Sequence, residues 1–227
     1  MFKDNMSQAE LQQIENQLSC PNGDDGIEMA KAMNDSNIAM TLATIKALEI
    51  KDHDAVLEIG HGNCQHLPHI LEQASSIRFT GLEIAPTMQQ EALRMNQTYL
   101  NQAKPNSLEF LLYDGKKLPF ADDFFARIMT VNTLYFWQDH TGFLAEIFRV
   151  TQSGGRLAIA FAQKRFMQNL PFVQDKFTLF DNAAIHQLVA DSHFSLHDII
   201  DVHDQVQNKQ GDWVEREFSV AVLEKPI

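Results

Sequence analysis

Residues 56–64, with the sequence Val-Leu-Glu-Ile-Gly-His-Gly-Asn-Cys, form the segment whose residue types and spacing most directly indicate chemistry. An apolar run that carries Glu58 leads into a loop with two glycines, Gly60 and Gly62, and a helix-compatible stretch follows. A strand, a glycine turn and a helix in this order form the nucleotide site of doubly wound α/β domains. Glycine suits that loop because a side chain would block the ligand or require a costly positive φ. A dinucleotide fingerprint would place a third glycine at position 65, which is Gln65 here.

Further polar residues follow later apolar runs of the chain. Glu83 lies at the end of the run 77–84, where a carboxylate suits a bidentate contact with a ribose diol, although an exposed acid at a strand end is the alternative interpretation. Asp114 follows the next run, and an Asp-Gly pair is also common in ordinary turns. Asn132 follows a fourth run, at the switch point where open α/β sheets bind ligands. The pattern predicts a ligand site at this edge of a sheet.

The order Glu-x-Gly-x-Gly-x-Cys at residues 58–64 resembles the first motif of class I S-adenosylmethionine (SAM)-dependent methyltransferases, in which a third glycine usually stands where this chain has Cys64. Residues 118–126 are similar to the family signature Leu-Pro-Phe-x-Asp-x-x-Phe-Asp, with Ala126 in place of the final acid. Both segments occur in the order that the family shows.

A third resemblance lies at residues 146–157, which are similar to the family run Glu-x-x-Arg-Val-Leu-x-Pro-Gly-Gly-x-Leu, with Gln152 and Ser153 in place of Lys-Pro. The bacterial small-molecule enzymes of this family, a group that includes quinone-biosynthesis methyltransferases, resemble the chain best. The resemblance extends from about residue 27 to the C-terminus and is strongest over residues 56–64, 79–92, 110–137 and 144–162.

The resemblance implies SAM as the cofactor, with S-adenosylhomocysteine as its product. It implies that Glu58 faces the methionine ammonium, that Glu83 binds the ribose, and that Asp114 accepts a hydrogen bond from the adenine amine. Met88 is expected beside the adenine and Asn132 at the methionine end. The predicted cofactor-binding residues are Glu58, Gly60, His61, Gly62, Asn63, Cys64, Glu83, Ile84, Met88, Asp114, Gly115 and Asn132.

The resemblance also implies methyl transfer to a small-molecule acceptor. Positioning and desolvation supply most of the acceleration in such a displacement. The catalytic residues stay unknown, and a hydroxyl acceptor would need a base, for which His61 or Tyr135 is the candidate. Three consecutive aromatic residues, at 135–137, come shortly after Asn132. Each of them either lines the acceptor pocket or lies near the sulfonium, or alternatively closes the core under the terminal hairpin. The predicted acceptor pocket comprises Met33, Asn34, Asn37, Tyr135, Phe136 and Trp137.

The elements that position these residues follow from the periodicity of apolar side chains. Strands are predicted at 55–59, 77–84, 108–112, 126–131 and 156–162, and helices at 65–74, 86–100, 141–150 and 182–190. Two strand-like segments, 195–203 and 213–224, predict a terminal antiparallel hairpin. We therefore expect an α/β, Rossmann-like, doubly wound sheet of seven strands, mostly parallel, with helices on both faces. Residues 1–50 are expected to form a helical cap over the site, broken at 21–23 and 24–26, and residues 51–227 a single SAM-binding domain.

Composition limits the partners. The chain has 227 residues, a net charge of −12 and a hydrophobic content of 44%, which suits one globular α/β domain. Without a Lys/Arg cluster, nucleic acid and anionic membranes are not expected as partners, whereas a basic polypeptide stays possible on charge alone. Two cysteines are too few for a disulfide framework. The chain lacks a recognisable signal or membrane-length apolar run, so a cytoplasmic monomer or homodimer is expected.

Nine histidines raise the question of a metal site. His66 and His69 have a helical i, i+3 spacing and lie near His61, but a third ligand at recognisable spacing is lacking, so we predict no metal. Two other functions stay open. One is a SAM-binding regulatory protein without methyl transfer, which the departure at Cys64 allows. The other is a nicotinamide-dependent oxidoreductase, which Gln65 disfavours.

Overall fold

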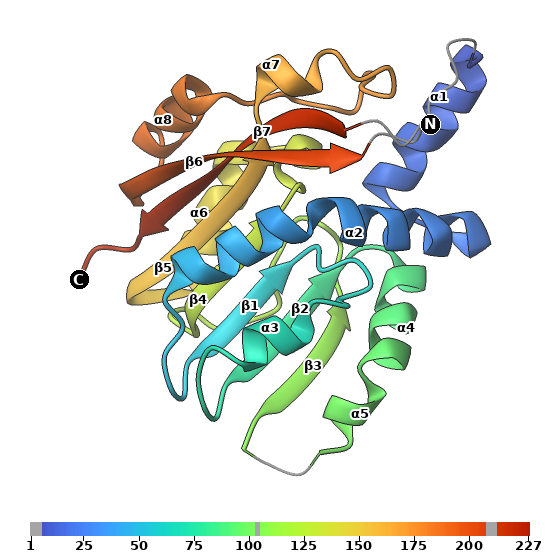
Figure 1. The fold of residues 1–227 in the computed structure, drawn as a ribbon. Coiled ribbons are helices and arrows are strands. Elements are labelled where there is room, and N and C mark those ends of the chain that lie inside the picture. The colour runs from blue at the N-terminus through green and yellow to red at the C-terminus, as the bar shows by residue number, and fades with distance from the viewer. Residues whose placement is uncertain (1–5, 103–104, 208–212) are drawn as a thin grey trace.

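A seven-stranded mixed sheet forms the centre of the computed structural model, which describes residues 6–102, 105–207 and 213–227 (Figure 1). The strand order is β3-β2-β1-β4-β5-β7-β6, with β1 to β5 parallel and β7 antiparallel to both of its neighbours. The predicted doubly wound sheet with an antiparallel hairpin is confirmed. The strands are β1 (Ala55–Ile59), β2 (Arg78–Glu83), β3 (Ser107–Leu112), β4 (Phe125–Val131), β5 (Thr151–Ala162), β6 (Ser195–Gln207) and β7 (Trp213–Glu224).

Helices lie on both faces of this sheet. On one face the long helix α2 packs against β4, β5, β7 and α4, and α6 lies behind the sheet (Figure 1). The helix α8 packs against β6 and β7. The helical elements are α1 (Gln8–Ser19), α2 (Gly23–Leu48), α3 (Leu67–Leu71), α4 (Pro86–Met95), α5 (Gln97–Leu100), the 3-10 helix η1 (Leu134–Phe136), α6 (His140–Val150), α7 (Lys164–Met167) and α8 (Asn182–Ala190).

Three helices differ from the sequence-based expectation, each for a local reason. The stretch 65–74 is helical only over α3, because residues 60–66 are used in the glycine loop. The stretch 86–100 divides at Asn96, whose side-chain amide donates to the carbonyl of Cys64 (3.1 Å) and holds α4 against that loop. The break expected at 24–26 does not occur, since α2 begins at Gly23 and carries two acidic residues in its first turn, where the helix dipole favours them.

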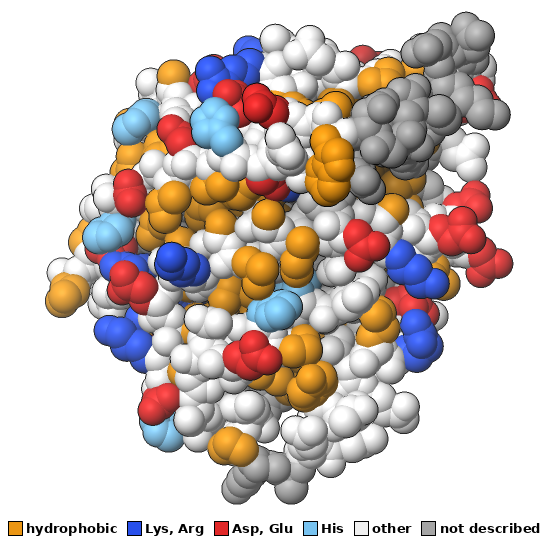
Figure 2. Space-filling model, viewed as in Figure 1, with side chains coloured by type: hydrophobic (Ala, Val, Ile, Leu, Met, Phe, Trp, Pro, Cys, Tyr) orange, Lys and Arg blue, Asp and Glu red, His pale blue; other side chains and the backbone are white. Residues whose placement is uncertain are grey.

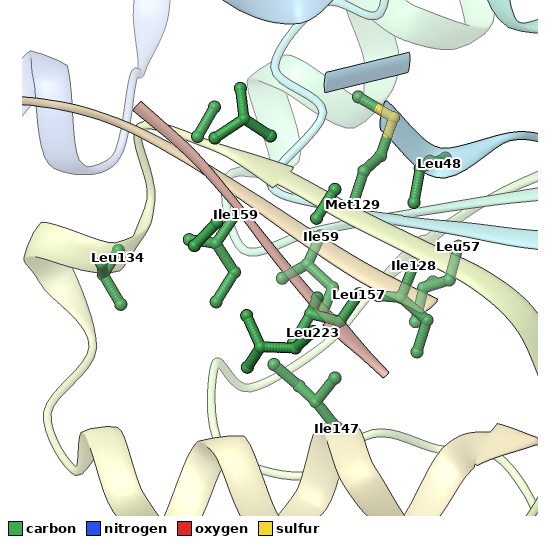
Figure 3. Packing of buried hydrophobic residues seen from close by; sticks show 14 of the residues in the cluster. Leu48, Leu57, Ile59, Ile128, Met129, Leu134, Ile147, Leu157, Ile159 and Leu223 are labelled. Carbon is green, nitrogen blue, oxygen red and sulfur yellow. The ribbon is translucent and has the colours of Figure 1, made fainter. Parts of the chain in front are cut away.

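The core continues through the sheet on both of its faces. Every residue of β1 is buried, as expected for a central parallel strand covered by helices on both sides. Figure 3 shows Leu48 of α2 and Ile147 of α6 on opposite sides of strand residues such as Leu57 and Leu157. Glu58 is the polar exception within β1, and it lies at the strand end that faces the site.

The described part of the surface in Figure 2 carries no dense group of basic side chains, in agreement with the negative net charge of the sequence. On the face that carries α2, Lys and Arg side chains are scattered, and hydrophobic side chains gather between the β6–β7 hairpin and α2 (Figure 2). Among the described residues, no helix combines the length and apolar character needed to cross a membrane.

Candidate active site

The ends of β1, β2, β3 and β4 meet at one cavity of about 480 Å³. Side chains and backbone of all four strand ends contribute to its wall, and residues 18–21 together with Met33 close it from the side of α1 and α2. Of the predicted cofactor residues, the cavity is lined by Gly60, Gly62, Glu83, Ile84, Met88, Asp114, Gly115 and Asn132. We name this space the main cavity.

The two loop glycines differ in their surroundings, although both have a positive φ (+73° for Gly60 and +57° for Gly62). A Cβ at Gly60 would collide with Cγ2 of Thr133, so this glycine allows two loops to pack together. A Cβ at Gly62 would meet no atom within 4 Å, because the residue faces open space in the main cavity. Gly62 is therefore the position where the backbone is exposed to a ligand.

Glu83 is fixed by the backbone around it. Oε2 of its buried carboxylate accepts from the N–H of Gly62 (3.0 Å), and Oε1 accepts from Ile84 (2.7 Å) and Ala85 (3.1 Å). A carboxylate has about four acceptor positions, so one on Oε2 stays open toward a ligand. Burial raises the pKa of Glu83, and the three backbone donors oppose that rise.

Asp114 lies exposed at the mouth of the main cavity. Its Oδ1 accepts from the N–H groups of Lys116 and Lys117 (2.9 Å each), which lowers the pKa of the carboxyl and leaves Oδ2 for another donor. Gly115 (φ +76°) turns the chain here, beside the exposed side chain of Ile84. The residue thus forms both the ordinary Asp-Gly turn and a wall of the site.

A second, smaller cavity of about 90 Å³ adjoins the main one and is lined by Glu58, His61 and Asn63 together with Asn34 and Asn37 of α2. Gly60, Gly62, Met88 and Met33 line both cavities. The carboxylate at its base is paired, since Nε2–H of His66 donates to both oxygens of Glu58 (2.8 and 2.9 Å). Both side chains of the pair are buried.

Cys64, the departure from the family motif, does not point into either cavity. Its φ is +48°, and its thiol is fully buried beneath the loop, where Sγ lies 3.9 Å from Oε2 of Glu58. Burial, followed by the charge of Glu58, raises the pKa of this thiol, so it is protonated at neutral pH. The extra side chain therefore leaves the ligand side of the loop open.

Glu58, Cys64 and His66 bring three buried ligand-type atoms within 4.8 Å of one another. Two ligands on one tetrahedral zinc ion would lie roughly 3.3–3.6 Å apart, given metal–ligand bonds of about 2.0–2.2 Å. The separation of 2.8 Å between His66 and Glu58 is instead that of a charge-assisted hydrogen bond. We interpret the cluster as a hydrogen-bonded histidine–carboxylate pair, and the absence of a metal stays a prediction.

The structure places His61 deeper than a loop position implies. Its ring is buried between Gly81 and Phe110, whose ring lies edge-on with a centroid separation of 5.1 Å. Nδ1–H donates to the carbonyl of Gly62 (2.8 Å), and Nε2 has no hydrogen-bond partner among the described residues. Burial lowers the pKa of His61 to about 4, so the ring is neutral at pH 7.

A third cavity of about 190 Å³ lies on the other side of Asn132 and is mostly apolar. Of the predicted acceptor residues, Met33, Asn37, Tyr135 and Phe136 line it, whereas Trp137 lines the main cavity and Asn34 the second. We name it the acceptor cavity.

The side chains of Asn132 and Tyr135 are hydrogen-bonded to each other where the main cavity meets the acceptor cavity. Asn132 has a left-handed φ of +57°, and its Oδ1 accepts from the hydroxyl of Tyr135 (3.0 Å). Burial raises the pKa of Tyr135, whose oxygen also accepts from the N–H of Ala162 (2.5 Å). The left-handed φ of Asn132 is a sparsely populated backbone conformation for a non-glycine residue, and such conformations are common at functional sites.

Sequence reasoning missed three residues that the structure brings to the site. Thr133 packs on Gly60, His66 pairs with Glu58, and Arg216 of β7 lines the acceptor cavity. The spacing of Glu58 and His66 across one turn carried a weak signal. Arg216 carried none, because its place depends on how the terminal hairpin joins the sheet.

The chain is similar to known methyltransferases in sequence. Residues 57–159 match the family model described as a methyltransferase domain. An uncharacterized methyltransferase of Bacillus subtilis, YdaC, is 25% identical over 116 residues, which are 51% of this chain and 60% of that protein. An O-methyltransferase of Aspergillus nomiae, rstn1, is 29% identical over 140 residues, which are 62% of this chain and 58% of that protein. The chain thus aligns with about three fifths of the length of these curated relatives.

Solved structures share the fold. A chain in the complex between the Haloferax volcanii Trm112 methyltransferase activator and a methyltransferase superposes with a TM-score of 0.71, at 18% identity, covering 87% of this chain and 94% of that one. At this identity the similarity shows the architecture alone.

Proposed function

We propose that the protein is a class I SAM-dependent methyltransferase that transfers a methyl group from SAM to a small-molecule acceptor, because residues 57–159 match a methyltransferase-domain model and the chain is similar to methyltransferases. The observation that carries the proposal is the main cavity, where one wall residue at each of four strand ends offers what SAM needs. Gly62 leaves room for close approach, and Glu83, Asp114 and Asn132 supply oxygen or amide groups.

Each part of SAM has a matching group in this arrangement. The open position on Oε2 of Glu83 suits a ribose hydroxyl, and the free Oδ2 of Asp114 suits the exocyclic amine of adenine. The second cavity suits the methionine end, since Glu58 offers a carboxylate to the ammonium, and the amides of Asn34 and Asn37 offer donors to the methionine carboxylate. One small cavity thus holds both a carboxylate and neutral amide donors.

The position of Met33 supports the proposal that the cofactor and the acceptor occupy adjoining cavities. It lines the main cavity, the second cavity and the acceptor cavity, so it marks the point where the three spaces meet. We propose that the transferred methyl group passes here. We further propose that the cap consists of α1 and the N-terminal half of α2, because residues 18–21 and 33–37 wall the cavities while the C-terminal half of α2 is part of the core.

The protein contributes mainly by binding and by exclusion of water. When bound, SAM supplies a methyl group on a positively charged sulfur that leaves as neutral S-adenosylhomocysteine. The residues around Met33 hold the two reactants in line, and the apolar side chains of Met33 and Phe136 exclude water beside Asn132, which favours a reaction that disperses charge. His61, with its pKa near 4 and its ring beneath the loop, suits packing of the loop better than proton removal.

Titration calorimetry with SAM, S-adenosylhomocysteine and NAD tests the donor site, on the wild type and on Glu83→Ala. We expect micromolar binding of SAM and its product, roughly −8 kcal/mol, weakened in the variant and absent for NAD. Binding of NAD in place of SAM would favour the oxidoreductase alternative. Folded protein that binds neither compound would remove the donor site.

The regulatory alternative is separated from the enzyme by turnover. Release of S-adenosylhomocysteine, measured across a panel of acceptors, is expected for the enzyme and not for a protein that only binds SAM. The reason for that alternative was the extra side chain of Cys64, which is buried away from the cavities.

A further inference from the structure

The acceptor cavity has a composition that narrows the class of acceptor. Its apolar wall is formed by flexible and aromatic side chains from α2, η1, α7 and the segment after α7, and it continues into the main cavity at Met33, Asn132 and Phe136. A concave apolar pocket with a few convergent polar groups is typical of small-molecule sites. The principal apolar residues are Met33, Met40, Phe136, Phe166, Met167 and Phe177.

One charged side chain, Arg216 of β7, interrupts the apolar wall and is only 4% exposed. Its Nε and Nη2 donate to the two carboxylate oxygens of Asp204 (3.0 and 2.6 Å), and Nη1 donates to Oδ1 of Asn37 (3.2 Å). A guanidinium has five N–H groups, so these bonds leave one N–H on Nη1 and one on Nη2. Among the described residues, no further partner of Arg216 takes them.

The pair with Asp204 decides the kind of ligand group that Arg216 suits. Asp204 neutralises the guanidinium and holds it in one plane, so the two remaining N–H donors of this cavity-lining residue come without net positive charge. A second carboxylate here would bring an unpaired negative charge into an apolar space, which is costly. A neutral oxygen, such as a carbonyl, accepts these donors without that cost.

The sheet sets the distance between the two ends of the cavity. Asn132 follows β4 and Arg216 lies on β7, and these strands are separated by β5 alone. Two strand spacings amount to roughly 10 Å across the sheet, and Arg216 is displaced further along β7, two residues beyond Phe218, which pairs with Ala162 of β5. An acceptor that fits about 190 Å³ is the size of one or two rings.

We infer that the acceptor is a mostly apolar molecule of one or two rings, whose neutral oxygen accepts a hydrogen bond from Arg216 at the end opposite the atom that is methylated. This inference rests on the proposed function, because it takes the boundary at Met33 and Asn132 as the place of methyl transfer. Arg216 is then the residue that selects the acceptor.

A matched set of three probes tests the inference: tetralin, 1-tetralone and tetrahydro-1-naphthoate, which share a two-ring body and differ in carrying no oxygen, a neutral carbonyl or a carboxylate. Each is titrated into the protein saturated with S-adenosylhomocysteine, and separately into the protein alone. A hydrogen bond from a charged donor is worth about 1.5–3 kcal/mol. We therefore expect the ketone to bind about 10- to 150-fold more tightly than tetralin, and more tightly than the carboxylate.

The variant replaces the ion pair as a unit, because Arg216→Gln alone would leave the partly buried Asp204 without its charged partner. The double variant Arg216→Gln, Asp204→Asn keeps a polar contact, and its fold is checked by thermal unfolding and by binding of S-adenosylhomocysteine. The matched control is Arg165→Gln. It breaks the ion pair between Arg165 of α7, which is exposed, and Glu217, the neighbour of Arg216 on β7. We expect the preference for the ketone to fall to about 3-fold or less in the double variant and to persist in the control.

Several results would overturn the inference. They are tightest binding of the carboxylate, an undiminished ketone preference in the folded double variant, or binding of none of the probes by protein that binds S-adenosylhomocysteine. Failure of S-adenosylhomocysteine to bind would instead count against the proposed function, and the titrations without it would still report on the acceptor cavity.

Discussion

The two loop glycines provide a sharp test, because Gly60 and Gly62 share a positive φ and differ in what a side chain would meet. Alanine at Gly62 enters open space on the ligand side, and alanine at Gly60 enters Cγ2 of Thr133. We predict that Gly62→Ala impairs SAM binding and reduces stability less than Gly60→Ala does. Gly60→Ala is predicted to reduce stability first.

The magnitudes follow from two separate costs. A left-handed φ costs an alanine about 1–2 kcal/mol, which applies to both variants. Overpacking adds about 1–3 kcal/mol for Gly60→Ala alone, so its total loss is about 2–5 kcal/mol. For a chain of this size about 1 kcal/mol lowers Tm by roughly 2–4 °C. A methyl group in the path of SAM is expected to cost about 1–3 kcal/mol of binding, or about 5- to 150-fold in Kd.

The companion substitution Thr133→Ser isolates the clash. Serine removes Cγ2 and keeps the hydroxyl that contacts Thr130 and accepts from Nε1 of Trp137. In the double variant Gly60→Ala, Thr133→Ser, the overpacking cost should disappear while the cost of the left-handed φ stays. Urea denaturation gives the stabilities, and calorimetry gives Kd for SAM.

Two results would refute this reasoning. One is a Gly62→Ala variant whose Kd for SAM stays within about 3-fold of the wild type, a difference of less than about 1 kcal/mol. The other is a stability loss in Gly60→Ala that Thr133→Ser leaves unchanged. The first would place the ligand elsewhere, and the second would show that the loop relaxes away from Thr133.

Three further predictions concern the polar groups of the site. SAM affinity should weaken as pH falls through the raised pKa of Glu83, since ribose hydroxyls bond best to the ionised carboxylate; a calorimetric Kd that is constant between about pH 7 and pH 4.5 would contradict this. The stability effect of Glu83 has the opposite sign. Because the folded-state pKa of Glu83 lies above the unfolded value, its contribution to the free energy of unfolding declines as pH rises between these two pKa values. The variant Glu83→Gln should remove this slope. His66→Ala should cost about 3–5 kcal/mol in urea denaturation because it leaves Glu58 buried without its partner, and His66→Gln, which keeps a donor, should recover part of that loss; equal losses would refute the pairing. Tyr135→Phe should cost about 1–3 kcal/mol in thermal unfolding, since the N–H of Ala162 and Oδ1 of Asn132 lose their partner, and an unchanged Tm would argue against these bonds.

The strands could be predicted from sequence because their periodicity is set by burial. A central strand such as β1 is buried on both faces, so its apolar run marks its bounds directly. The helices were less predictable where a side chain competes with helical bonding. Asn96 divides the stretch 86–100 by donating to the loop at Cys64, a contact between residues that only the folded chain brings together.

The residues of the candidate site likewise include some that the sequence predicts and others that it does not. The place of Glu83 and Asp114 at one edge of the sheet could be predicted, because Glu83 ends β2, Asp114 lies two residues after β3, and parallel strands bring their carboxyl ends together. The acceptor cavity could not, because its walls come from α2, η1, α7 and the terminal hairpin, whose packing no local pattern specifies. Arg216 illustrates this limit, since its role depends on the pairing of β7 with β5 and on a contact with Asn37 of α2.

The glycine motif itself separates into three physical requirements that the sequence shows as one pattern. Position 60 needs glycine because Thr133 packs against it, and position 62 because the backbone there faces the cavity. Position 64 needs only a positive φ, with its side chain directed into the core, so Cys64 meets the requirement at about 1–2 kcal/mol of backbone strain. Its buried thiol offsets part of that strain by filling space above Glu58. The departure from the motif therefore falls at the position of the three that lines neither the main cavity nor the second cavity, so the side chain of Cys64 leaves the cavity side of the loop unchanged.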